Sequence, residues 1–293
     1  MGGAESGPVL VGVRNPEHVR QLVRTAADLA GLSSNRVRLV AVAVKDYDSP
    51  FGVFDDETIL REFAGASHDL VERAESPPNV DLDRDVVTAR SASAGLIDAV
   101  EDTNATGLVV GWSGPTSRAD AVLGTTVDDL VERAPCDLYV ERVGREADGV
   151  ETVFLPVAGG PHVGAAARVA AAIAARNEAQ IVIYSVAPDP DERELGASRV
   201  TAGQEAIETI PGIDPDIETE VVVDSEPSAA VIAEAANHDV VVLGATRHGA
   251  FRRRLTGSIP RRVVDRTDTT VIIARDAASV GGLAARLGRV LRR

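Results

Sequence analysis

A glycine pattern that could bind phosphate occurs in the first half of the chain. It has four members, with nine residues between the second and the third: Gly111, Gly114, Gly124 and Thr125. Glycines let a backbone approach a phosphate closely, and the hydroxyl and free N–H groups at the start of a following helix can then hold the anion. The pattern therefore predicts an anion-binding loop that leads from a strand into a helix.

A second, altered copy lies 133 residues later, because 244 − 111 and 257 − 124 both equal 133. Its matching members are Gly244, Gly257 and Ser258, and Arg247 stands where the second glycine would be. The Arg247 side chain could block close approach of a phosphate, or its guanidinium group could itself bind one. We therefore expect phosphate binding in the first copy more than in the second.

The same order of elements surrounds each copy, with short apolar runs that alternate with helix-like stretches. The predicted strands are 8–13, 37–44, 81–89, 107–110, 138–142, 152–157, 180–186, 218–223, 239–243 and 270–274. Two of the predicted helices span 57–74 and 202–210. Such alternation predicts parallel α/β sheets with right-handed crossovers. In these sheets ligands bind beyond the carboxyl ends of the strands, where both glycine patterns begin.

The chain length of 293 residues and the duplicated pattern indicate two domains. We predict an N-terminal domain at 1–145, a C-terminal domain at 150–276 and a separate tail at 277–293. The tail has leucines at helical spacing with interleaved arginines. It could be a basic amphipathic helix that lies on an anionic membrane or a partner, or one that docks on its own acidic domain.

The formal net charge of −15 disfavours nucleic acid and anionic membranes as partners of the bulk surface. Lys45 is the only lysine among 30 basic residues, a composition that resembles proteins of salt-loving archaea, although a high-GC genome would also favour arginine. No apolar run approaches the ~20 residues that span a bilayer. The first seven residues lack the features of a signal peptide. We expect a cytoplasmic protein without membrane insertion.

Few residues suggest catalysis. Cys136 is the only cysteine and is interpreted as a small buried residue beside a strand. The histidines are scattered, and the sequence has no metal-binding cluster, no P-loop and no nucleophile elbow. Trp112, the only tryptophan, is expected to cover the end of the sheet, with stacking on a base as the alternative. We therefore predict that the protein is not an enzyme and needs no metal.

The glycine pattern after a fourth strand resembles that of the universal stress protein family, repeated in tandem over roughly 8–143 and 151–276. The resemblance implies two Rossmann-like domains of the adenine nucleotide alpha hydrolase-like type, each a five-stranded parallel sheet in the order 3-2-1-4-5. Members of the family pair through the fifth strand. The strands 138–142 and 270–274 would then face each other across a pseudo-two-fold axis, as a pseudo-dimer within the chain, and a homodimer is a further expectation.

The resemblance also implies a ligand, because many family members bind ATP or a related adenine nucleotide at this motif. Carried over to this chain, it implies phosphate and ribose contacts at Gly111, Gly114, Gly124 and Thr125, and weaker ones in the second copy. ATP-binding members usually carry an aspartate directly after the first strand. Arg14 and Ala158 stand at that place here and depart from the pattern.

Two functions follow as expectations from the resemblance. The first is a stress-response regulator that binds an adenine nucleotide, better in the N-terminal half. The second is an interaction module that binds no nucleotide and regulates a membrane transporter, because the segments 13–18, 111–114 and 244–247 look like those of universal stress domains associated with amino-acid transporters. Any such transporter would be a separate protein.

Overall fold

The computed structural model describes residues 7–45, 55–62, 64–112, 125–143, 149–245 and 269–279. The strands are β1 (Val9–Val13), β2 (Arg36–Val44), β3 (Asp81–Ala89), β4 (Gly107–Gly111), β5 (Asp137–Arg142), β6 (Thr152–Pro156), β7 (Gln180–Ala187), β8 (Ile217–Val223), β9 (Val240–Gly244) and β10 (Thr270–Arg275). The α-helices are α1 (Pro16–Gly31), α2 (Asp56–Glu62), α3 (Gly65–Glu72), α4 (Ala92–Thr103), α5 (Thr125–Arg133), α6 (Val163–Asn177), α7 (Arg193–Glu208) and α8 (Pro227–Ala235).

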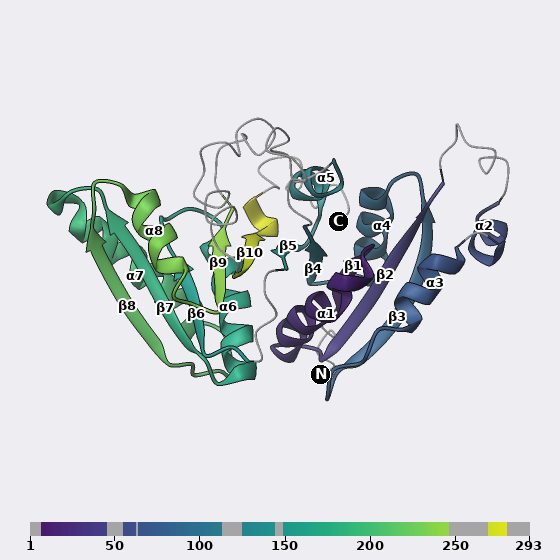
Figure 1. Cartoon of the computed structure of the whole chain (residues 1–293), viewed down its shortest axis with the longest axis horizontal. Coiled ribbons are helices and arrows are strands. Elements are labelled where there is room, and N and C mark those ends of the chain that lie inside the picture. Colours follow the sequence, from purple (N-terminus) through teal and green to yellow (C-terminus); the bar gives the residue numbers. More distant parts are fainter. Residues whose placement is uncertain are drawn as a thin grey trace, which may run out of the picture.

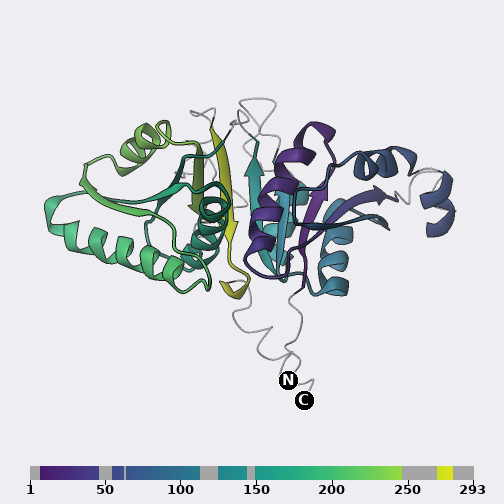
Figure 2. The same cartoon turned by 90° about the horizontal axis from the view of Figure 1, so that it is seen from below.

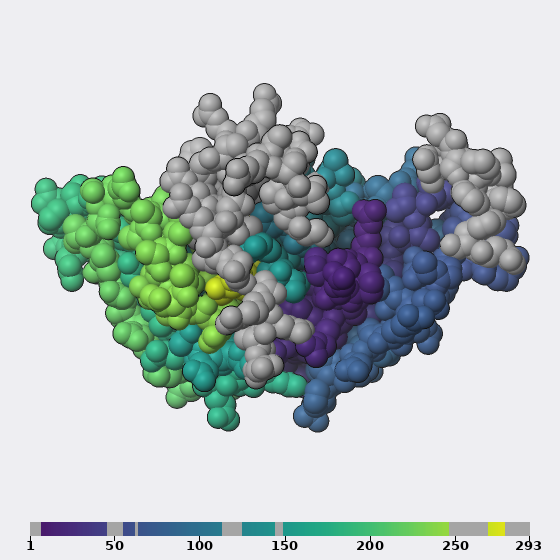
Figure 3. All heavy atoms as spheres, viewed as in Figure 1, coloured from purple at the N-terminus to yellow at the C-terminus, as the bar shows by residue number. Residues whose placement is uncertain are grey.

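The ten strands form one continuous sheet in the order β3-β2-β1-β4-β5-β10-β9-β6-β7-β8 (Figure 1). Each half thus has the predicted order 3-2-1-4-5, and all strand pairs within a half are parallel. The predicted α/β fold class is confirmed. Figure 3 shows the purple-to-blue N-terminal half and the green C-terminal half on the two sides of the molecule.

The two halves are joined through their fifth strands. β5 and β10 pair antiparallel, with Val140 opposite Ile273 and Leu138 opposite Arg275. This is the pairing that the resemblance implied, and it merges the two expected sheets into one. The antiparallel junction relates the halves by a pseudo-two-fold axis, so the carboxyl ends of their parallel strands point in opposite directions.

Local sequence signals explain where two helices of the first half begin. Asn15 precedes α1 and accepts a hydrogen bond from the Glu17 backbone N–H at 3.0 Å, with Pro16 at the first helical position. Ser91 precedes α4 and its hydroxyl oxygen accepts one from the Ala94 N–H at 3.1 Å. Both side chains satisfy N–H groups that a helix leaves without an internal partner.

Two predicted helices differ from the observed ones. The stretch 57–74 forms two helices, α2 and α3, and Gly65, a poor helix former, is the first residue of α3. The helix predicted at 202–210 begins earlier, at Arg193, and includes Gly196. Gly196 is present for packing, because a Cβ there would lie 2.7 Å from Cγ1 of Val221 on β8. This glycine therefore marks a close contact between helix and sheet.

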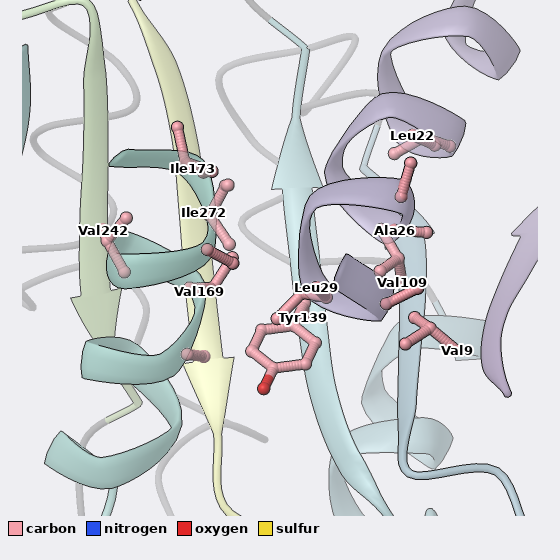
Figure 4. Close-up of a cluster of buried hydrophobic side chains, with 14 of the residues drawn as sticks. Val9, Leu22, Ala26, Leu29, Val109, Tyr139, Val169, Ile173, Val242 and Ile272 are labelled. Atoms are coloured by element: carbon pink, nitrogen blue, oxygen red, sulfur yellow. The ribbon is translucent and has the colours of Figure 1, made fainter. Parts of the chain in front are cut away.

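Helices cover both faces of the sheet, and α1 and α6 meet beside the junction of the halves. Figure 2 shows purple α1 and teal α6 close to the β5–β10 pair. α6 is rich in buried alanines, so it can lie close to the strands and to α1: Ala165, Ala166, Ala167, Ala170, Ala171, Ala172 and Ala174. In Figure 4, Val169 and Ile173 of α6 face Val242 and Ile272 of the sheet. The core thus continues across both halves.

Candidate ligand cavity

A cavity of about 200 Å³ lies in the C-terminal half, at the carboxyl ends of β6, β7 and β9. Its walls are mainly apolar and include Pro156, Tyr184, Val186, Val231, Leu243 and Ala245. Ligands of parallel α/β sheets bind at this end of the strands, where the loops diverge. The position and the apolar lining fit a small planar or aliphatic group.

A glycine-rich loop forms the rim of this cavity. Residues 158–162 connect β6 to α6, and Gly159 and Gly160 have positive φ angles of 79° and 114°. Positive φ angles are readily adopted only by glycine, so the course of this loop depends on both residues. The loop delivers the N-terminus of α6 to the cavity at Val163, where the first N–H groups of the helix lack internal partners. Such a terminus attracts anionic groups.

His162 fixes the rim to the neighbouring strands. Only 8% of it is exposed, and its Nδ1 accepts a hydrogen bond from the Asp276 backbone N–H at 3.2 Å. Its Cβ lies 3.4 Å from where a Cβ on Gly244 would be. Gly244, the first member of the altered pattern, therefore lies in ordinary packing contact with the start of α6.

His18 stands at the equivalent place in the first half, but it lies within α1, is only partly buried and has its Nε2 3.5 Å from Asn15 Nδ2. The registers of β1 and β6 place Val9 and Val153 at equivalent positions, 144 residues apart. The same offset relates His18 to His162. A Cβ on Gly111 would lie 3.4 Å from His18 Nδ1. These two histidines look scattered in the sequence, and their shared offset of 144 is the signal that pairs them.

In the described part of the first half, a larger side chain, Trp112, stands at the position where Ala245 lines the cavity in the second half. Trp112 and Ala245 are equivalent, because their N–H groups donate to the carbonyl oxygens of Glu141 at 2.7 Å and Ala274 at 2.8 Å. Trp112 is 6% exposed and belongs to the core, which confirms that it covers the sheet. A Cβ on Gly12 would lie 2.7 Å from Cδ1 of Leu96, so the Leu96 side chain lies over β1.

The predicted site residues are only partly within the described structure. Gly111 and Gly244 end β4 and β9, and Thr125 is the exposed first residue of α5. Five others lie outside the described residues, so their phosphate contacts stay predictions: Gly114, Gly124, Arg247, Gly257 and Ser258.

The two residues at the usual aspartate place differ in surroundings. Ala158 is exposed and lines the cavity. Arg14 is also exposed, but it borders a separate groove between α1 and α3, beside Arg20 and Asp69. Neither residue offers a carboxylate to a ribose. Recognition in this cavity would therefore depend on shape, backbone groups and apolar contact.

The strongly shifted acid groups lie away from the cavity. Burial raises the pKa of Asp28 on α1 to about 7, and Arg24 and Arg176 oppose this shift. Burial likewise raises the pKa of Glu141 on β5 to about 7; Thr25 and Gln21 oppose it, and the nearby Asp28 adds to it. The Thr25 and Gln21 side chains act as nearby hydrogen-bonding groups, although neither reaches a Glu141 oxygen with good hydrogen-bond geometry. These carboxyls belong to the packing of α1 on β5 rather than to a site.

Other chemical groups also have structural roles. Cys136 is buried, as predicted, and burial raises the pKa of its thiol to about 12. The thiol is therefore protonated at neutral pH and unsuited to nucleophilic attack. Among the described residues, no group of three or more His, Cys, Asp or Glu side chains could hold a metal ion. The helices described are all too short or too polar to cross a membrane.

The family model described as the universal stress protein family matches residues 6–142 and again residues 149–275. The chain belongs to the universal stress protein family. It contains two family domains in tandem, and the second includes the described cavity. No curated protein matches the sequence of this universal stress protein.

Solved structures share the fold of the tandem universal stress protein. A universal stress protein from Archaeoglobus fulgidus matches with a TM-score of 0.61 and 15% identity, over 93% of this chain and 97% of that one. A functionally unknown protein from Pseudomonas aeruginosa matches with a TM-score of 0.56 and 16% identity, over 97% and 98%. The cytoplasmic domain of a prokaryotic cation chloride cotransporter matches with a TM-score of 0.54 and 12% identity, over 96% and 99%.

Proposed function

We propose that this tandem universal stress protein is a regulator that binds an adenine nucleotide such as ATP and has no catalytic residues. The observation that carries the proposal is the apolar cavity at the carboxyl ends of β6, β7 and β9, with Gly244 on its lining. The altered glycine pattern continues from that residue. Nucleotide occupancy would change how the protein contacts a partner.

The cavity suits the base rather than the whole nucleotide. Its volume of about 200 Å³ is below the ~300 Å³ at which pockets for drug-sized ligands begin. A planar heteroaromatic ring would lie among Tyr184, Val186 and Leu243, where it would lose contact with water. The phosphates would then extend toward the start of α6 and the glycine pattern, in accord with the anion preference of a helix N-terminus.

This proposal places the adenine base in the C-terminal half rather than in the N-terminal half. The intact glycine pattern favours the N-terminal half. The described cavity favours the C-terminal half, since Trp112 and Leu96 occupy the equivalent space in the first half. Phosphate contacts at Gly114, Gly124 and Thr125 stay a prediction for the first half.

The test is calorimetric titration of ATP in molar KCl, which protects an acidic protein from self-repulsion. Ala245→Trp places a large ring in the cavity, whereas Ala202→Trp places one on the exposed side of α7. We expect wild type and Ala202→Trp to bind equally and Ala245→Trp at least ~10-fold more weakly, a difference of about 1.4 kcal/mol. Equal binding by all three proteins, or no binding by wild type, would refute the proposal.

The second candidate is an interaction module that binds no nucleotide and regulates a transporter. The absence of a carboxylate at Arg14 and Ala158 favours it. The fold shared with a cotransporter cytoplasmic domain is compatible with it. Its test is sedimentation of the protein with vesicles that contain a candidate transporter, against protein-free vesicles. Binding only in the first case, unchanged by ATP, would support this candidate over the first.

The proposal also covers the location, the source and the oligomeric state of the protein. We infer a cytoplasmic protein of a salt-loving organism that forms a pseudo-dimer within one chain and could pair further as a homodimer. Light scattering and thermal unfolding across KCl concentrations test these points. A monomer that is most stable at low salt would contradict both the homodimer and the salt-loving origin.

A further inference from the structure

A second cavity of about 370 Å³ lies between the two halves. Its apolar lining comes from β1 and α1 of the first half and from the end of α7 in the second half: Val9, Leu29, Leu32, Ala206, Ile210 and Pro211. Three hydroxyl-bearing residues also line it: Ser33, Thr106 and Thr209. It is separate from the cavity at the ends of β6, β7 and β9, because the two share no lining residue. The space exists only because the halves are in tandem.

Two glycines and a tyrosine shape its walls. A Cβ on Gly107 would lie 3.1 Å from the Tyr139 ring, so the glycine lets this ring lie against β4. Figure 4 shows Tyr139 beside Leu29 of α1, near the boundary with α6. Gly164 on α6 forms part of the opposite wall. The inter-half cavity therefore has an aromatic ring and aliphatic side chains on one side and a helix start on the other.

Arg168 supplies the positive charge in this cavity. Its Nη1 lies 2.8 Å from Asp137 Oδ2, and 51% of its side chain remains exposed. Within the described part of the chain it makes no other hydrogen bond or ion pair. Asp137 is itself held by the Ala277 N–H at 3.0 Å. One edge of the guanidinium group is thus fixed, and its other N–H donors remain available to a ligand.

The charges around Arg168 limit the ligand to a single negative charge. Asp137 and Asp276 both lie in this region, since the backbone from Asp276 to Ala277 reaches Asp137. Arg275 is a second cation near Asp137, so the two arginines and the two aspartates nearly balance in charge. A dianionic phosphate would therefore be repelled by the two carboxylates more strongly than a monoanion, which could accept hydrogen bonds from the remaining N–H donors of Arg168. A guanidinium fork matches the two oxygens of a carboxylate. The apolar lining then selects a carboxylate with an apolar body.

We propose that the inter-half cavity binds a small monocarboxylate with an apolar chain of medium length, with its carboxylate on Arg168 and its chain between α1 and α7. The volume exceeds the ~300 Å³ at which pockets for small organic ligands begin. A ligand that contacts both halves binds only their docked arrangement and stabilises it. The site is independent of nucleotide binding.

The experiment is calorimetric titration with octanoate, below the concentration at which it forms micelles, and with octanol as the uncharged probe. Arg168→Gln removes the charge, Arg168→Lys restores it, and Arg133→Gln on exposed α5 is the control. We expect saturable binding near one octanoate per chain in wild type and Arg133→Gln. Arg168→Gln should bind at least ~10-fold more weakly, with partial recovery in Arg168→Lys, and octanol should bind weakly to all.

A second variant tests the apolar part of the cavity. Ala206→Phe on α7 fills the space without a change of charge, and it should weaken octanoate binding while Arg168 keeps its partner. Ala245→Trp should leave octanoate binding unchanged, so failure of the nucleotide proposal would not affect this result. Equal octanoate binding by wild type and Arg168→Gln, or only non-saturating uptake by wild type, would overturn the proposal.

Discussion

The two halves share a fold and a register, but they differ where the carboxyl ends of their strands meet the helices. The residue type differs at four equivalent positions. With the N-terminal residue given first, the pairs are Gly12 and Pro156, Leu96 and Val231, Val110 and Leu243, and Trp112 and Ala245. In the first half the large side chains are buried in the core. In the second half the smaller Val231 and Ala245 line a cavity. A duplicated domain can thus keep its scaffold while only one copy keeps room for a ligand.

The glycine pattern shows the opposite asymmetry. It is intact in the half whose space is filled and altered in the half with the cavity. Glycines control how closely a backbone approaches a phosphate, whereas the room for a base depends on side chains from β1, α4 and the end of β4. The two requirements are separate, so an intact pattern does not identify the half that has room for a base.

The largest expected effect is at Trp112. Trp112→Ala would remove a buried ring from the filled half and cost about 3–5 kcal/mol of unfolding free energy. Urea unfolding in molar KCl measures it, with the exposed Ala202→Trp as a control that should change stability by less than ~0.5 kcal/mol. A loss of less than ~1 kcal/mol of unfolding free energy in Trp112→Ala would show that the buried ring contributes little to the stability of the first half.

Glu141 on β5 provides the next largest contrast, because its counterpart on β10 is the neutral Ala274. Burial raises the pKa of Glu141 to about 7, above the ~4.3 of an unfolded chain. Between these values the folded state binds more protons than the unfolded state, so stability falls as pH rises through this window. Asp28, whose pKa burial also raises, changes stability in the same direction.

Glu141→Gln should therefore stabilise the protein at pH 8, by roughly 3 kcal/mol for a pKa raised from 4.5 to about 7. The gain should vanish near pH 4, where Glu141 is protonated in both states. Denaturant unfolding at the two pH values measures it, with the exposed Glu101→Gln as control. A gain that is equal at both pH values would contradict the raised pKa.

A smaller effect is expected at the junction of the halves. Asp137 on β5 accepts from Arg168 of α6 and from the Ala277 N–H, and its counterpart on β10 is Thr270. Asp137→Ala removes both contacts and should cost about 1.5–3 kcal/mol. Scanning calorimetry should show the halves unfolding in two steps rather than one. A single unshifted transition would mean that other contacts hold the halves together.

The fold could be predicted from the sequence to a greater extent than the site. The strand order and the β5–β10 pair followed from apolar runs and a family resemblance, because each depends on repeated features. The start of α7 at Arg193 could not be predicted, because the packing of Gly196 against Val221 becomes apparent only in the folded structure. The cavity could not be predicted, because it depends on how side chains pack. In the first half the Leu96 side chain lies over Gly12, whereas in the second half Val231 lines the cavity.

The smallest effect compares the ends of α1 and α6. α6 ends at Glu178 in a left-handed conformation (φ 55°), which costs a non-glycine residue about 1–2 kcal/mol, whereas α1 ends at Leu32 in the right-handed region. Glu178→Gly should raise the unfolding free energy by up to ~1 kcal/mol, and Leu32→Gly should lower it. Thermal unfolding of the two variants measures the effect, and a change of the same sign in both would contradict this account.

Photolabelling with an azidoadenine analogue of ATP, followed by mass analysis of the labelled peptides, tests the central claim most directly. If the C-terminal half holds the base, the label will lie on the β7 or α8 peptides around Tyr184 or Val231, and unlabelled ATP will prevent the reaction. The contradicting result is a label on the equivalent β2 or α4 peptides, around Val42 or Leu96, that unlabelled ATP displaces. The N-terminal half would then hold the nucleotide.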